Sequence, residues 1–427
     1  MAMIHWSGAV IGLLISIVLI YKKVSPVYSL FTGAVIGGLA GGASIVQITQ
    51  IIIDGTNSVM GAVVRVLAAG VLAGILIESG AAEKIAETIV EKLGDQKALL
   101  AITLATMVIT AVGVFIAVSV IIVAPIALSV ARKVGISKSS ILLAMVGGGK
   151  AGNIISPNPN TIAVAKGFDL DLAQVMINGF IPAIVGLIVT YIVATLITQK
   201  GQVIQESEIA VTSTKTKPTF IRAMVAPVVA ILLLSISTIG SILGIPALAA
   251  IKIDSMIILP VAGLIGLAAM GKFHKAVAYT TSGLNKMAGT AIILIGAGAI
   301  AGVISKSNLS DVVVQGIQSL GISGMYLAPI SGILMAGATA STATGSIVAA
   351  GTFGKAILAM GVSPLSAAIM VHTGAVVIDH MPHGNFFHAS GDAVKMSIKD
   401  RMKLMPYESI VGASMCITAT IVYGLLK

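Results

Sequence analysis

The hydrophobic residues of this chain occur in long runs that short polar segments separate, without the alternation of a half-buried strand. A helix needs about 20 such residues to cross the hydrocarbon core of a bilayer, and lipid permits only helices or closed barrels as spanning structures. The pattern therefore predicts an all-α polytopic membrane protein. The predicted spans are residues 5–21, 27–53, 59–79, 98–131, 139–165, 175–198, 222–244, 253–271, 287–305, 325–354, 363–388 and 405–426.

Four of these spans depart from a single straight crossing. Residues 98–131 and 325–354 are too long for one crossing and have Gly-rich or Ser/Thr-rich centres, so we expect a re-entrant helical hairpin in each. Residues 139–165 and 363–388 are interrupted by Pro, Asn, His and Gly, so we expect broken helices there. The carbonyl and amide groups freed at such breaks need partners that lipid cannot supply.

The chain divides into two similar halves at a polar linker, residues 199–221. Each half, 1–198 and 222–427, contains five predicted crossings and one hairpin, and an odd number of crossings inserts the second half in the opposite orientation. Inverted repeats with broken helices are typical of secondary transporters. The matching segments keep an offset of about 224 to 228 residues; examples are Leu72–Ser79 with Ile300–Ser307, and Ser156-Pro157-Asn158 with Pro382-His383-Gly384.

Composition agrees with lipid as the solvent. The 427 residues are 57% hydrophobic and 10% charged, with a mean hydropathy of +1.06, whereas a soluble protein has roughly 25% charged residues. The first apolar run lacks a preceding basic residue and a clear cleavage site, so we expect a span there and not a signal peptide. Cys416 is the single cysteine, which excludes intramolecular disulfides and cysteine metal clusters.

The net charge of +10 is spread over the loops and does not form the stripe of a nucleic-acid-binding protein. With the N-terminus outside, the cytoplasmic loops carry 19 Lys and Arg residues, Lys138 and Arg401 among them, and the outer loops carry five. Basic residues collect on the cytoplasmic side of membrane proteins. We therefore expect an inner (plasma) membrane protein with an outside N-terminus and a cytoplasmic linker. Arg65 and Lys150 lie within spans.

The first break combines two prolines with short polar side chains. Pro157 and Pro159 remove backbone donors and end helices. The half-helix that begins near Asn160 directs its positive end at the break, which suits an anion. A proline kink satisfied by neighbouring helices is the alternative. The polar residues that we interpret as substrate-binding are Asn153, Ser156, Asn158, Asn160 and Thr161.

The second break, His372–His388, contains four of the six histidines of the chain. Ionisable groups within a span are costly and usually functional, and an imidazole exchanges protons near neutral pH. We interpret Asp379, His380 and His383 as proton-coupling residues. A zinc site is the alternative, although no second cluster completes a ligand set, and His388 could lie at the cytoplasmic interface. Gly384 and Asn385 complete the substrate site predicted at this break.

The tip of the second hairpin is rich in hydroxyl groups. Such groups and the backbone amides at a helix–helix turn can bind a carboxylate and sugar hydroxyls; bonds from these side chains to their own helix are the alternative. The tip of the first hairpin is far more apolar. The tip residues that we assign to the substrate site are Ser341, Thr342, Thr344 and Gly345.

With these motifs the chain resembles the gluconate permease family, the gluconate:proton symporters of the ion transporter superfamily. The similar stretches are Val114–Val118 before Pro125, Ser156–Ala163 at the first break, and Asp379–Phe387 at the second. The resemblance covers nearly the whole chain. It implies an elevator-type fold, a homodimer and proton-coupled uptake of gluconate or a related hydroxy-acid, with no cofactor and no metal.

Two positions depart from the family pattern. Ala117 stands where the family usually has an acidic residue, and Asn158 stands where it has a histidine. Proton handling is then expected at the second break. A sodium-coupled or exchange transporter of di- or tricarboxylates such as citrate is the alternative, but two carboxylates would need more positive charge than Lys150 and Arg65 supply. An enzyme is disfavoured because no nucleophile triad, metal motif or phosphate loop is present, and paired breaks favour alternating access over a pore.

Overall fold

The computed structural model describes residues 4–205, 216–251, 253–319 and 323–426, and the regular structure in these ranges is helical apart from one bridge between Ile4 and Ser307. Five of the described helical segments are long and apolar enough to cross a membrane, and two bent helix pairs raise the number to seven. The predicted all-α membrane architecture is therefore confirmed. The five segments are Ile45–Glu78, Ile116–Val134, Phe220–Ser237, Phe273–Ser305 and Ile398–Leu425.

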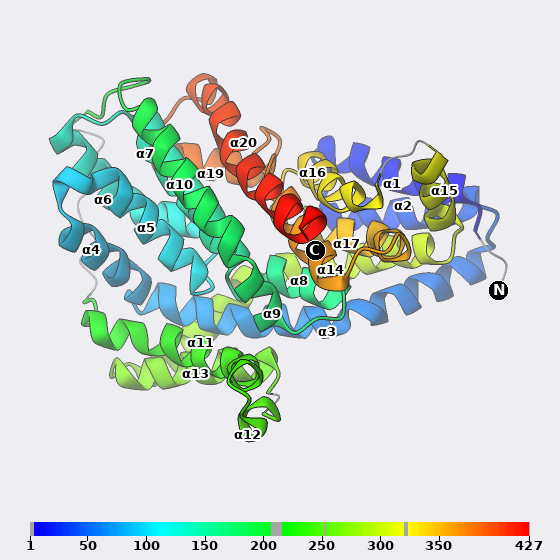
Figure 1. The fold of residues 1–427 in the computed structure, drawn as a ribbon, viewed down its shortest axis with the longest axis horizontal. Coiled ribbons are helices and arrows are strands. Elements are labelled where there is room, and N and C mark those ends of the chain that lie inside the picture. Colours follow the sequence, from blue (N-terminus) through cyan, green and yellow to red (C-terminus); the bar gives the residue numbers. More distant parts are fainter. Residues whose placement is uncertain (1–3, 206–215, 252, 320–322, 427) are drawn as a thin grey trace.

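A first helix group forms around two long helices, α3 and α14, which pack along each other (Figure 1). The helix α13 packs on α3 and on α11, while α2 packs on α1 and on α14. The group consists of α1 (Trp6–Tyr21), α2 (Pro26–Ala40), α3 (Ile45–Glu78), α11 (Phe220–Ile242), α12 (Pro246–Ala249), α13 (Ser255–Ala269), η3 (Phe273–Lys275) and α14 (Ala276–Ser305).

Glycines allow α3 and α14 to approach closely at two places. A Cβ atom at Gly55 would lie 2.3 Å from the carbonyl oxygen of Gly298, and one at Gly283 would lie 2.0 Å from the carbonyl oxygen of Gly70. Both distances are shorter than any real carbon–oxygen contact. Small residues give membrane helices this close packing, in which dispersion takes the place of the hydrophobic effect.

A second helix group contains the remaining helices, among which α7, α10 and α20 run side by side (Figure 1). Its members from the first half are α4 (Ala81–Leu93), η1 (Asp95–Lys97), α5 (Ala98–Ala111), α6 (Ile116–Val134), α7 (Lys138–Ile154), α8 (Pro159–Gly167), α9 (Leu172–Asn178) and α10 (Phe180–Leu196). Those from the second half are α15 (Leu309–Ser319), η4 (Gly324–Tyr326), α16 (Leu327–Thr339), α17 (Thr342–Ala359), α18 (Pro364–Ala375), α19 (Asn385–Ala393), α20 (Ile398–Thr420) and the π-helical turn η5 (Ile421–Leu425).

The interruptions predicted in four spans are present. A turn at Gly113, with φ +107°, separates α5 from α6, and Ala340, with φ 47°, separates α16 from α17. The chain leaves α7 after Ile154 and enters α8 at Pro159, while α18 and α19 are separated by residues 376–384. Each interruption thus joins two helices whose ends meet inside the second group.

The predicted boundary between spans 27–53 and 59–79 is wrong. The chain turns earlier, at Gly42 with φ +90°, and α3 then runs unbroken to Glu78. Ser44 and Gln47 form a reciprocal capping box that starts α3. The polar residues Asp54 and Asn57, which lie between the two predicted spans, are on the exposed side of the helix, so they do not interrupt its backbone bonds.

Two amphipathic helices, α4 and α15, were not predicted as separate elements. Each follows a long helix, α4 after α3 and α15 after α14. Lys217, in the linker before α11, pairs with Glu83 of α4 at 2.7 Å and with Glu87. Part of the predicted linker 199–221, residues 206–215, lies outside the described residues.

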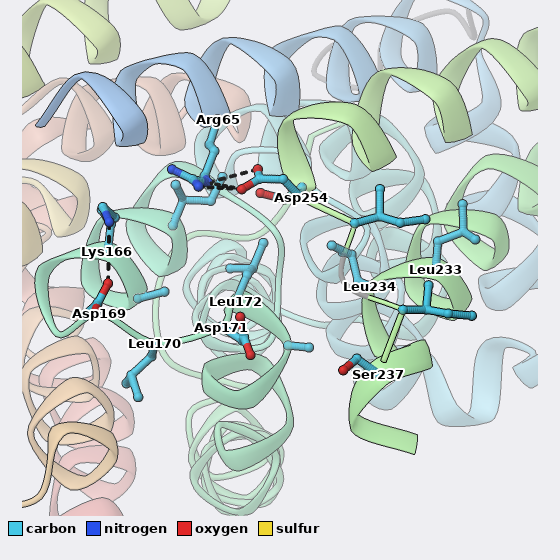
Figure 2. Close-up of a pocket in the computed structure, with 16 residues that line it drawn as sticks. Arg65, Lys166, Asp169, Leu170, Asp171, Leu172, Leu233, Leu234, Ser237 and Asp254 are labelled. Carbon is cyan, nitrogen blue, oxygen red and sulfur yellow. Dashed lines mark hydrogen bonds and ion pairs between the residues drawn. The ribbon is translucent and has the colours of Figure 1, made fainter. Parts of the chain in front are cut away.

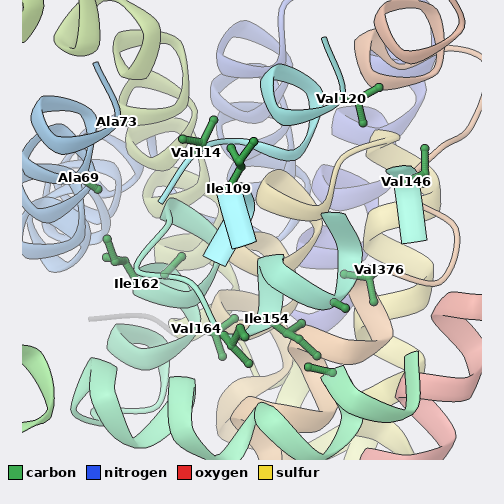
Figure 3. Packing of buried hydrophobic residues seen from close by; sticks show 14 of the residues in the cluster. Ala69, Ala73, Ile109, Val114, Val120, Val146, Ile154, Ile162, Val164 and Val376 are labelled. Carbon is green, nitrogen blue, oxygen red and sulfur yellow. The ribbon is translucent and has the colours of Figure 1, made fainter. Parts of the chain in front are cut away.

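Aliphatic side chains surround the first helix break, where residues 155–158 are all buried. Ile154 at the end of α7, Ile162 and Val164 of α8, and Val376 after α18 belong to one buried cluster with Ile109 of α5 (Figure 3). The non-helical backbone is therefore enclosed by protein, as a break at membrane depth requires.

Candidate substrate site

One cavity of about 620 Å³ brings both helix breaks and both hairpin turns together. Ile20 and residues Lys23–Pro26 at the α1–α2 turn also contribute to its wall, as do Thr290 and Ile293 of α14, so the first helix group takes part. The volume falls in the range of small-molecule sites. The lining residues at breaks and turns are Phe115–Val118, Asn160, Thr339–Thr344, Asp379, and His383–Phe386.

Three helices begin at this cavity: α6 after Phe115, α17 after Ser341 and α19 after Gly384. The side chain of Ser341 caps α17 by accepting the amide hydrogen of Thr344. The caps of α6 and α19 make no side-chain hydrogen bond, so their first amides have no capping side chain. Unpaired amides at helix N-termini bind anions, and here two such ends face one cavity.

Gly384 lets the second break approach the second hairpin. A Cβ atom at this position would lie 2.5 Å from the carbonyl oxygen and from the Cβ atom of Ala340. A larger residue would force the N-terminus of α19 away from the turn between α16 and α17. Gly345, also predicted for the site, lies against Ala336 inside the hairpin and does not line the cavity.

The asparagines of the first break bond mainly to one another. The side-chain Oδ1 of Asn158 caps α8, accepting from the backbone amides of Asn160 at 2.9 Å and Thr161 at 3.1 Å. Its amide nitrogen donates to the backbone and side-chain oxygens of Asn153. Asn160 alone of the five predicted residues lines the cavity, and its buried Oδ1 has no partner among the described residues. Asn153, Ser156, Asn158 and Thr161 lie behind it.

An ion pair connects the first and second breaks. Lys150 of α7 donates to Oδ1 of Asp379 at 2.7 Å, to Nδ1 of His380 at 3.1 Å, and to the carbonyl oxygen of Val376. Thr342 at the hairpin turn donates to the other oxygen of Asp379 at 2.5 Å. Asp379 thus faces the cavity, and Lys150, on the side away from the cavity, balances its charge. Lys150 was noted as a charge within a span, but its pairing was not predicted.

The other predicted proton carriers have separate positions. His380 is fully buried behind Asp379 and does not line the cavity. His383 lines it, with Nε2 at 3.2 Å from the carbonyl oxygen of Ala338 and its ring 5.2 Å from that of Tyr21 on α1. His388 also lines the cavity, and its Nε2 is 2.9 Å from the carbonyl oxygen of Pro382.

Arg401 is not the loop residue that the charge count assumed. It lies inside α20, 1% exposed, and pairs with Glu408 of the same helix at 2.7 Å. Its guanidinium also donates to Ser390 and lies 5.0 Å from the ring centre of Phe387. Sequence reasoning missed Glu408. An Arg and a Glu seven positions apart, on one face of an apolar helix, were the available signal.

A second, smaller cavity of about 300 Å³ lies elsewhere, lined by Arg65 of α3 and the chain around Lys166 and Asp254 (Figure 2). Arg65, noted as a charge within a span, pairs here with Asp254. Burial raises the pKa of Asp254, but hydrogen bonds from Arg65 and the Met256 amide, with the charges of Arg65 and Lys166, hold that pKa below its usual range. None of the predicted substrate or proton residues lies in this cavity.

Comparison with known proteins shows what the chain is similar to. The profile of the GntP family permeases matches residues 1–426. A protein of Haemophilus influenzae named as an uncharacterized transporter is 51% identical over 420 residues, 98% of each chain. The high-affinity gluconate transporter of Escherichia coli is 22% identical over 436 residues, 96% of each chain. The fold resembles that of the Alcanivorax borkumensis YdaH transporter, with a TM-score of 0.61, 14% identity and 89% of each chain covered.

Proposed function

The chain belongs to the GntP family of permeases, and on that basis we propose that this membrane transporter is a proton-coupled symporter of gluconate or a related small hydroxy-acid anion. The observation that carries the proposal is the cavity shared by Asn160, Asp379 and the hairpin residues Ser341 and Thr342. Ser341, Thr342, Thr344, Gly384 and Asn385, with Asn160, are the proposed substrate contacts.

The charges around the cavity favour a monoanion. Lys150 and Arg65, the basic residues noted within spans, are paired with Asp379 and Asp254. Lys23 at the α1–α2 turn is the lysine that lines the cavity itself, and it supplies one positive charge, enough for one substrate carboxylate. A substrate carboxylate is then bound mainly by the first amides of α6 and α19. The hydroxyl groups of the second hairpin form hydrogen bonds with the substrate hydroxyls, as donors or as acceptors. A di- or tricarboxylate would leave charge unbalanced in this cavity.

Asp379, His380 and His383 are the proposed proton carriers. Asp379 and His383 line the cavity, and His380 adjoins Asp379 with Nδ1 at 3.3 Å from Oδ1. A carboxylate and an imidazole in contact can exchange a proton near neutral pH. The proton and the anion would therefore be bound at one cavity, which is what their obligatory co-transport needs.

The helix order supports two inverted repeats, residues 1–198 and 222–427, joined by the linker. Helices α6, α7, α8 and α9 begin at residues 116, 138, 159 and 172, and α17, α18, α19 and α20 each begin 226 residues later, at 342, 364, 385 and 398. The glycine contacts of α3 and α14 follow the same symmetry. Gly55 and Gly283 are 228 residues apart, and so are Gly70 and Gly298, so the Gly55–Gly298 contact corresponds to the Gly283–Gly70 contact. A pseudo-two-fold axis between the repeats gives this reciprocity.

We further propose an elevator mechanism in a homodimer of the inner membrane, with the N-terminus outside. The second helix group, which carries both breaks and both hairpins, would be the moving part, and the group around α3 and α14 the fixed scaffold. The α1–α2 turn, which completes the cavity wall, would contact substrate only in one position of the moving part.

Transport into proteoliposomes tests the function. We expect inward accumulation of labelled gluconate when the outside is more acidic, with acidification of the lumen, and we expect thermal-shift stabilisation by gluconate within a panel of organic acids. Uptake that follows a sodium gradient and ignores pH would contradict proton coupling. Stabilisation by citrate but by no monocarboxylate would replace the proposed substrate with a tricarboxylate.

A further inference from the structure

A chain of buried ionisable groups leads from the cavity into the second helix group. Its members, none more than 2% exposed, are Lys150, Asp379, His380, Glu408 and Arg401. Asp379 lies at the cavity, and Arg401 is the last member on the side away from it. Five such groups are expensive to bury, and a substrate site that uses Asp379 does not by itself require Glu408 and Arg401.

The hydrogen bonds of His380 determine which nitrogen is free to gain a proton. Nε2 lies 3.1 Å from the carbonyl oxygen of Met405, which can only accept. Nε2 therefore carries hydrogen in the neutral ring, and the Ser409 hydroxyl oxygen, 3.2 Å away, is a second acceptor for it. Nδ1 accepts from the ammonium of Lys150 at 3.1 Å. Nδ1 is thus the atom that becomes protonated when the ring takes a charge.

Charged groups from three segments face Nδ1. They are Lys150 of α7, Asp379 beside the ring, and Glu408 of α20, whose Oε2 is 3.6 Å away. Arg401 holds Glu408 through both oxygens, at 2.7 Å and 3.0 Å. With a neutral ring the two cations and two carboxylates of the chain balance, so one further proton gives it a net charge of +1.

Resting on the proposed function, we propose that Glu408 is the counter-ion that lets His380 carry the coupled proton, and that Arg401 is its positioning residue. A hydronium ion in the cavity protonates the carboxylate of Asp379 and is left as water, and the proton then passes from Asp379 to His380, whose Nδ1 is 3.3 Å from Oδ1. The O–H bond on Asp379 breaks as the N–H bond forms on Nδ1, and Lys150 turns from Nδ1 toward its other two acceptors. The charge of +1 then balances the bound monoanion, so each stabilises the other.

Removing both charges of the Arg401–Glu408 pair tests this role without leaving a buried charge unpaired. For Arg401→Gln/Glu408→Gln we expect the pH profile of gluconate uptake to move to lower pH by about one unit or more, because the carboxylate that faces the protonated ring is lost. Gluconate exchange measured in acid should remain within about twofold of the unaltered protein, because the substrate contacts are untouched. The matched control is Asp400→Asn/Lys403→Gln, a pair on the same helix with a 2.9 Å separation, in which Lys403 is exposed and Asp400 is partly exposed.

An unaltered pH profile in the double variant would overturn the proposal, and so would loss of exchange in a folded protein. Glu408→Asp, which retracts the carboxylate but keeps its charge, should shift the profile less and in the same direction; no shift there would also count against Glu408. If the unaltered protein shows no proton-driven gluconate uptake, the proposed function fails first, which separates the two results.

Discussion

The ammonium group of Lys150 lies 2.7 Å from Oδ1 of Asp379, with both side chains buried. Lys150 also donates to the carbonyl of Val376 at the end of α18, where the helix dipole is negative. The lysine thus neutralises both a carboxylate and a helix C-terminus. Thr342 bonds to the free oxygen of Asp379, so one carboxylate joins α7, the second break and the second hairpin.

Removing one partner of this pair should destabilise the protein. We expect Lys150→Met to lower the free energy of unfolding by about 3–5 kcal/mol, because Asp379 is left charged and buried. Lys150→Met/Asp379→Asn should recover most of that loss yet remain inactive in uptake. Denaturation in detergent and uptake into proteoliposomes measure the two effects, and an active double variant would refute the role of Asp379.

The two asparagines of the first break should respond differently to substitution. Asn160→Ala should weaken gluconate binding roughly tenfold or more, because a hydrogen bond to a charged ligand is worth about 1.5–3 kcal/mol. Asn158→Ala should instead cost about 1 kcal/mol of stability as a lost helix cap, with a smaller effect on affinity. Calorimetric titration and thermal unfolding separate them. Equal affinity in Asn160→Ala and the unaltered protein would move the site away from α8.

Close packing of α3 on α14 should tolerate no side chain at Gly283. A Cβ atom there would meet the Gly70 carbonyl, so Gly283→Leu should prevent correct packing and reduce the yield of folded protein. Gly289→Ala on the same helix meets no atom within 4 Å and should be neutral or stabilising by up to about 1 kcal/mol. Size-exclusion profiles and unfolding temperatures of both variants check this, and a well-folded Gly283→Leu protein would contradict it.

The proposed topology places the linker in the cytoplasm and the α8–α9 loop outside. In a Cys416→Ala background we expect Val203→Cys, 79% exposed, to resist an impermeant maleimide in intact cells. Asp169→Cys, at a side chain 95% exposed, is the control and should react from outside. The reverse labelling pattern would invert the topology.

The Arg65–Asp254 pair should make stability depend on pH. Because the pKa of Asp254 is lowered in the folded protein, its contribution is present above the ordinary carboxyl pKa of about 3.9 and is lost as the pH falls through the lower folded value. The difference in unfolding temperature between the unaltered protein and Asp254→Asn should therefore shrink in acid. If the difference in unfolding temperature between the two proteins stays constant from neutral pH to strong acid, the charge of Asp254 does not contribute to stability and only the packing of its side chain does.

The sequence alone determined that the chain is a helical membrane protein with interrupted spans, because hydrophobic length and helix-breaking residues are local properties. Pro157 and Pro159 predict the first break whatever surrounds them. The cluster at residues 379–388 likewise predicts the second, since polar groups at membrane depth must be enclosed. Span boundaries were less certain, as α3 shows: exposed polar residues do not end a helix that tertiary contacts support.

Only the tertiary structure decided which of the polar groups work together. Lys150 and Asp379 are 229 residues apart, and no local pattern predicts that pairing. Asn158 and Asn160 look equivalent in sequence, yet the backbone turn directs one to cap α8 and the other to the cavity. Arg401 resembles a loop charge until α20 buries it against Glu408. These choices depend on distances across the folded chain, and periodicity along the sequence carries no information about them.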